Sequence, residues 1–183
     1  SMDELLKRLE EEDRKLNEES KETLERLRKH DEDLNRKNRE KLKELKDRVD
    51  RVLEDAKKRV PDEDLERIKK RLEELRRTNE ELDRENEKLA EDLAREVKKT
   101  NEENRRTSKR IKEEADKLKK RKISEDDVRR EVEDVKRRIE DSREKLRKLT
   151  EKWKKLNRES DEKVKKHVED VEREIEKVRK EAE

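Results

Sequence analysis

The most constraining feature of this sequence is a line of residues, mostly apolar or small and polar, that recurs with a period of 18 residues. On a helix these residues would follow one side, and we call this line the seam. In residues 9–60 successive seam positions are separated by 4, 3, 4, 4 and 3 residues, and the pattern recurs in residues 72–122 and 128–178. Eighteen residues in five turns give 3.6 residues per turn, the period of the α-helix itself. A heptad repeat would instead impose a left-handed supercoil. We therefore expect long helices that pack along one seam and remain nearly straight.

The composition favours helix over disorder. Charged residues make up 64% of the chain, but 60 Lys and Arg nearly balance 58 Asp and Glu, leaving a net charge of +2. Leu, Ile and Val number only 36 of 183 residues, which is close to the range of disordered chains, although disorder normally also goes with a high net charge. Glu, Lys, Arg and Leu are strong helix formers, and opposite charges four residues apart stabilise helices. A disordered chain would not keep three seams in phase.

Several classes of function lack the residues they require. The chain contains no Cys and no Gly, so it has no disulfide framework, thiolate metal site, phosphate-binding glycine loop or nucleophile elbow. It has no apolar run long enough to cross a membrane. Its balanced charge produces no overall field that would attract nucleic acid or anionic lipid.

Two interruptions divide the chain into three predicted helices. The first is Val60-Pro61, because proline disfavours helix in the residue before it, and Asp62 or a neighbour can cap the next helix. The second is Ile123-Ser124, where Ser124 followed by acidic residues has the form of a capping box. We expect helices over residues 3–59, 63–121 and 125–182, each about 85 Å long. Lysines in 117–122 fit the end of a helix better than a nucleic-acid patch.

These helices predict an all-α fold, an elongated antiparallel three-helix bundle forming a single domain over residues 1–183. With turns near residues 61 and 123, residues at equal height have numbers that add to about 124 on the first two helices. On the second and third helices the numbers add to about 246. This height rule places polar residues of different helices side by side. We expect them to bond one another, because buried amides and hydroxyls need hydrogen-bond partners. We expect one layer of Asn38, Asn86 and Ser160, another of Ser20, Asn104 and Ser142, and a flanking pair of Asn17 and Thr107. Two further predicted pairs are Asn79 with His167 and Asp31 with Trp153.

No constellation in the sequence predicts catalysis or metal binding. His30 and His167 would lie on the order of 20 Å apart in height, and neither has a second His or a Cys one turn away. Asp13 and Asp31 are the only carboxylates on a seam, and we expect Asp31 to accept a hydrogen bond from the Trp153 indole or a nearby Lys. We predict no enzyme activity, no cofactor and no metal.

The 18-residue seams, the matched helix lengths, the Glu, Lys and Arg surface and the layered polar residues resemble those of de novo, parametrically designed helical bundles. Ser1-Met2, typical of an expression scar ahead of a designed start at Asp3, adds to the resemblance. The absence of Gly at the helix ends departs from the usual cap.

The resemblance implies an artificial, monomeric, rod-like scaffold without natural activity or partners, produced recombinantly in cytoplasm, with no natural location defined. A homo-oligomer stays open. The alternatives are a natural spectrin-like spacer, a coiled-coil interaction module, or a helical segment that binds nucleic acid or acidic lipid. Natural spacers usually follow a heptad repeat, and a basic stripe is missing.

Overall fold

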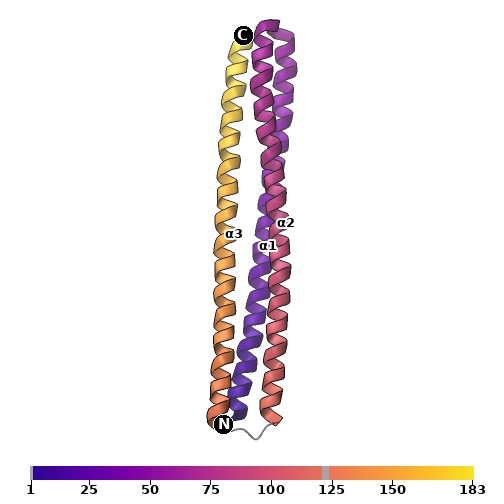
Figure 1. The fold of residues 1–183 in the computed structure, drawn as a ribbon. Coiled ribbons are helices and arrows are strands. Elements are labelled where there is room, and N and C mark those ends of the chain that lie inside the picture. The colour runs from indigo at the N-terminus through magenta and orange to yellow at the C-terminus, as the bar shows by residue number, and fades with distance from the viewer. Residues whose placement is uncertain (1, 121–123) are drawn as a thin grey trace. The chain divides into compact units, whose positions relative to one another are not determined.

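The protein is an all-α three-helix bundle, as predicted (Figure 1). The computed structural model describes residues 2–120 and 124–183. Helix α1 spans Met2–Arg59, α2 spans Asp62–Lys120 and α3 spans Glu125–Ala182, and no strand occurs in these described ranges. The three lengths are 58, 59 and 58 residues. The predicted helix boundaries agree with these bounds to within one residue, except that the predicted end of the second helix at residue 121 lies outside the described residues.

The helix ends follow the local sequence signals. The Pro61 carbonyl accepts a hydrogen bond from Leu65 N at 2.9 Å, which begins the helical pattern of α2. The Ser124 hydroxyl accepts a bond from Asp127 N at 3.4 Å and donates to Asp127 Oδ2 at 2.9 Å. Acidic residues occupy the first turns of α1 and α2, and basic residues occupy the last turns of all three helices. Both placements are favourable toward the helix dipole.

The chain divides into two compact units, and each unit contains a part of all three helices. Unit 1 comprises Ser1–Lys29 and Leu93–Lys154, and unit 2 comprises His30–Asp92 and Lys155–Glu183. The single domain and the straightness that the sequence suggested stay predictions.

Unit 1 has an apolar core built from all three helices. Ion pairs across it fix the directions of the helices: Lys119 Nζ lies 3.3 Å from Glu10 Oε1, and Arg138 Nη1 lies 3.0 Å from Glu114 Oε1. Because the start of α1 and the start of α3 both lie beside the end of α2, α2 is antiparallel to its two neighbours. The core residues are Leu6, Leu9, Leu16, Ile111, Ala115, Leu118, Val128, Val132, Val135 and Ile139.

Unit 2 also has an apolar core, and its helices run in the same directions. Arg48 Nη1 of α1 lies 3.7 Å from Glu172 Oε1 of α3, and Arg71 Nε of α2 lies 2.8 Å from Glu174 Oε1 of α3. One buried cluster contains Leu45, Val49, Ala56, Val60, Leu65, Ile68, Leu72, Val171, Ile175 and Val178, and a smaller one contains Leu42, Leu82 and Val164.

The burial pattern follows the 18-residue seam. Every seam position in the described part of the chain is buried or half-buried, and no large apolar side chain there is exposed. The prediction began the second seam at Leu72, but Leu65 and Ile68 are also buried. They belong to the first turns after Pro61, where they complete the core of unit 2. In the ranges described, no helix is long and apolar enough to span a bilayer.

Candidate functional site

His167 and Asn79 form a buried polar pair in unit 2. Asn79 Nδ2 donates to the Leu42 carbonyl at 2.9 Å, and Asn79 Oδ1 lies 3.0 Å from His167 Nε2. A carbonyl can only accept, so the amide is oriented with its oxygen toward the imidazole, and His167 Nε2 carries the proton. Burial lowers the pKa of His167, an effect that the charge of Asp170 opposes. The arrangement therefore holds a neutral imidazole and ties α1, α2 and α3 together at one height.

Asn86 and Ser160 also meet in unit 2, but the third expected member of their layer does not join them. The Ser160 hydroxyl donates to Asn86 Oδ1. Asn38 Nδ2 instead donates to Asp161 Oδ1 at 2.9 Å. The predicted layer of three residues is therefore wrong in its detail. Asn86 and Ser160 form a pair, and Asn38 makes a separate hydrogen bond to Asp161. The physical reason is that a carboxylate is a stronger acceptor than an amide or a hydroxyl.

Asp31 is buried in unit 2, with 4% of its surface exposed. Burial raises the pKa of Asp31, and the neighbouring Asn157 amide and the charge of His30 partly oppose this rise. The Asn157 Nδ2 nevertheless makes no hydrogen bond of normal geometry within the described chain. The expected bond from Trp153 is absent, because the buried indole Nε1 has no hydrogen-bond partner among the described residues. Asn157, one turn after Trp153 on α3, is the residue that approaches Asp31.

In unit 1, Ser20 and Asn104 are brought together as the height rule predicts, whereas Ser142 is not. Asn104 Nδ2 donates to Ser20 Oγ at 2.5 Å. Ser142 is half-buried on α3, and no hydrogen bond of its side chain to another described residue is present. The layer is thus a pair that links α1 and α2, and it does not extend to α3.

Unit 1 contains a second group of polar side chains, joined by hydrogen bonds, that the sequence does not predict. Asn17 Nδ2 donates to Ser108 Oγ at 2.6 Å, and Ser108 Oγ donates to Asp13 Oδ2 at 2.6 Å. The height rule pairs Asn17 with Thr107, but the observed partner is the next residue, Ser108. Ser108 is itself a seam position. Its number and that of Asn17 add to 125, close to the 124 of the height rule, so the rule could have identified this pair. A serine next to a threonine gave no reason to choose between them.

The arrangement of these groups contains no recognisable catalytic centre. Within residues 2–120 and 124–183 no three His, Cys, Asp or Glu side chains are placed to hold a metal ion. The single neutral imidazole in the core faces an amide and not a hydroxyl that it could activate. The chemistry these groups can perform is mutual hydrogen bonding across helices.

Comparisons with known proteins return no match: no family model, no curated protein and no solved structure is similar to this chain.

Proposed function

We propose that the chain is an artificial structural scaffold: a monomeric three-helix bundle whose role is to hold its own fold, with no natural biochemical activity. The observation that carries the proposal is the agreement between the 18-residue repeat and the burial of all three helices. Natural spacers and coiled-coil modules usually follow a heptad repeat and vary in helix length. Here the period stays in phase along three helices of 58, 59 and 58 residues.

The polar pairs of the seams support a structural purpose. Asn79 with His167, Asn86 with Ser160 and Asn104 with Ser20 each join two different helices. A shift of one helix along its neighbour would place these groups against apolar side chains, where an unsatisfied buried group costs about 1–3 kcal/mol. We propose that these hydrogen bonds form a network that specifies the register of the helices.

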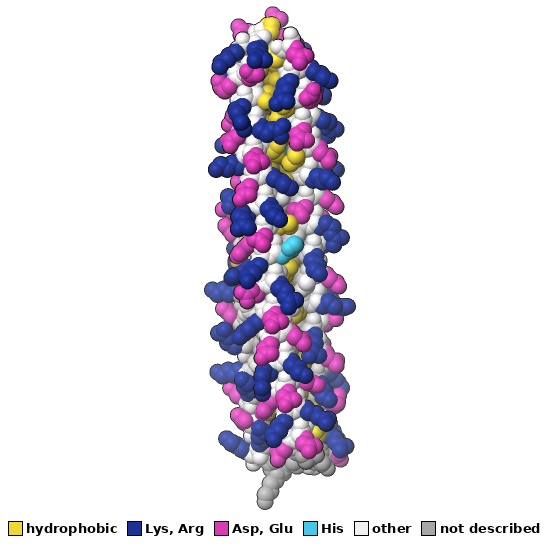
Figure 2. Space-filling model, turned by 180° about the vertical axis from the view of Figure 1, so that it is seen from behind, with side chains coloured by type: hydrophobic (Ala, Val, Ile, Leu, Met, Phe, Trp, Pro, Cys, Tyr) yellow, Lys and Arg dark blue, Asp and Glu magenta, His cyan; other side chains and the backbone are white. Residues whose placement is uncertain are grey.

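The surface supports the monomeric state. In the described chain no large apolar side chain is exposed. On the face shown in Figure 2, acidic and basic side chains intermingle and apolar atoms are visible only in a narrow line between them. A stable interface generally requires a buried apolar centre of considerable area, and this surface offers none to a second copy.

Sedimentation equilibrium over a range of concentrations, combined with denaturant unfolding, tests this proposal. We expect the mass of one chain, 22.6 kDa, at all concentrations, and reversible unfolding without added partner or ligand. A dimer mass, an unfolding midpoint that rises with protein concentration, or a chain that folds only with a partner would contradict the proposal.

A further inference from the structure

The groove between α1 and α2 of unit 1 carries an excess of positive charge. A cavity of about 680 Å³ lies along it. Five basic side chains and a single carboxylate, Glu25, line this cavity, whereas basic and acidic residues are almost equal in number over the whole sequence. The basic residues are Lys21, Arg28, Arg105, Lys109 and Lys112.

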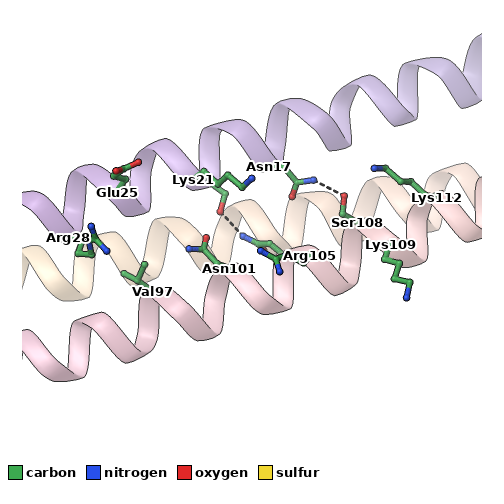
Figure 3. Close-up of a pocket in the computed structure, with 12 residues that line it drawn as sticks. Asn17, Lys21, Glu25, Arg28, Val97, Asn101, Arg105, Ser108, Lys109 and Lys112 are labelled. Atoms are coloured by element: carbon green, nitrogen blue, oxygen red, sulfur yellow. Dashed lines mark hydrogen bonds between the residues drawn. The ribbon is translucent and has the colours of Figure 1, made fainter.

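These cations lie in two rows, one on each side of the groove. Lys21 and Arg28 are two turns apart on α1, and Arg105, Lys109 and Lys112 follow one face of α2 (Figure 3). In this view Lys112 extends into the space between the helices, whereas Lys109 turns outward. Lys21, Arg105 and Lys112 form no ion pair with any residue that the structure describes. Their charges therefore remain available to a ligand in the groove.

The floor of the groove is polar. Ser20 and Ser108 are buried there, and their hydroxyls accept hydrogen bonds from Asn104 and Asn17. Asn101 is half-buried at the wall, and its amide makes no hydrogen bond within the described residues. An amide of this kind can donate to an anionic oxygen. The cavity therefore combines cations at its rim with a neutral donor at its wall.

We propose that this groove binds a small, linear, multivalent oxyanion of the condensed-phosphate class. The lining runs from Asn17 to Arg28 along α1, about 16 Å, so a single orthophosphate cannot reach cations at both ends. A chain of linked phosphates can contact Lys21 on one side and Arg105 and Lys112 on the other. Arg105 presents the forked donors that suit phosphate oxygens, and the lysines supply point charges.

Calorimetric titration of the full chain with tripolyphosphate at low ionic strength tests this site. We expect one saturable site that weakens as salt screens the charges. The double variant Arg105→Gln with Lys112→Gln should bind about fivefold or more weakly, since each exposed ion pair contributes up to about 1 kcal/mol. Glu25→Gln should bind more tightly, because it removes the one carboxylate among the residues that line the groove.

The matched control is Arg130→Gln with Arg137→Gln, which makes the same change in net charge at exposed positions of α3. It should leave the affinity within about twofold, and circular dichroism should confirm that all variants keep the helical fold. Equal weakening by both double variants, weaker binding by Glu25→Gln, or no saturable binding would overturn the proposal. So would orthophosphate binding as tightly as tripolyphosphate, or a single-stranded oligonucleotide binding more tightly in the same groove.

Discussion

Asp31 carries an electrostatic cost within the core of unit 2. Its carboxylate is buried, and burial raises its pKa above the value of an unfolded chain. A group with a raised pKa in the folded state stabilises the fold most at pH values below its unfolded pKa, and this contribution is lost as pH rises through the folded pKa. At neutral pH the ionised Asp31 is therefore unfavourable to folding.

We predict that Asp31→Asn increases the free energy of unfolding at pH 7 by on the order of 1 kcal/mol. The substitution keeps the size of the side chain and removes its charge. The difference between wild type and variant should shrink as pH falls below about 4, where Asp31 takes up a proton even in the unfolded chain. Urea titrations at pH 7 and pH 3 measure both effects. If the variant is less stable than wild type at pH 7, the surroundings of Asp31 offset the cost of burying its carboxylate, and the prediction is wrong.

His167 gives the opposite dependence on pH. Its pKa is lowered by burial, so the unfolded chain binds a proton more readily than the folded one. The contribution of His167 to the free energy of unfolding is then fully present above the unfolded pKa of about 6.5, and it is lost as pH decreases toward the folded pKa. We expect the free energy of unfolding to decrease between pH 7 and pH 5.

The His167→Gln variant should lose most of this decrease, because glutamine does not titrate. The matched variant is His30→Gln, which makes the same substitution at an exposed imidazole outside the core. Unfolding curves at pH 7, 6 and 5 for the three proteins provide the measurement. If His167→Gln keeps the full pH dependence, the buried imidazole is not its source.

At the scale of the helices, the sequence predicts most of the fold because its signals are local and repeated. Pro61 and Ser124 mark the two breaks, and the 18-residue period identifies the buried side of each helix. The sequence prediction omits Leu65 and Ile68, because it begins the second seam at Leu72. Both residues extend that seam toward Pro61.

The polar partners were less predictable, because height along a helix does not determine the direction of a side chain. The height rule places Asn86 with Ser160, which both lie on the seam, and Asn79 with His167, which lies next to the seam position Val168. Asn38 lies at the same height as Asn86 but bonds Asp161, since a carboxylate at the edge of the seam is the better acceptor. Asp161 lies next to the seam position Ser160, and height alone gives no reason to choose it over Ser160 as the partner of Asn38.

Ser124 offers a test of the capping signal at the start of α3. Its hydroxyl bonds both the backbone and the side chain of Asp127. Ser124→Ala removes these bonds and should lower the free energy of unfolding by about 0.5–2 kcal/mol. Ser124→Thr keeps the hydroxyl and should cost less. If alanine and threonine have the same effect in thermal unfolding, the cap contributes nothing.

At the scale of the whole chain, the dense surface charge contributes less to stability than its abundance suggests. The ion pairs of the described residues are mostly between exposed side chains, for example Arg26 with Glu22, which are 81% and 68% exposed. Such pairs contribute between 0 and about 1 kcal/mol each and are screened by salt. Because the net charge is only +2, salt also relieves little overall repulsion.

We therefore predict that raising the NaCl concentration from low to molar values changes the free energy of unfolding by less than about 2 kcal/mol. Urea, which is uncharged, is the suitable denaturant for this comparison. A large loss of stability with salt would show that the surface ion pairs act as a cooperative network, and that the apolar seams contribute less than the burial pattern suggests.

The central claim, that polar seam residues from different helices meet and set the register, is tested most directly by a double-mutant cycle on Asn86 and Ser160. The free energies of unfolding of wild type, Asn86→Leu, Ser160→Ala and the double variant give the coupling between the two side chains. We expect a coupling of about 0.5–3 kcal/mol, with the double variant less destabilised than the two single effects together imply. The control cycle, Asn86→Leu with Ser20→Ala, joins residues of different units and should be additive within about 0.5 kcal/mol. Additivity in the Asn86 and Ser160 cycle would contradict the claim.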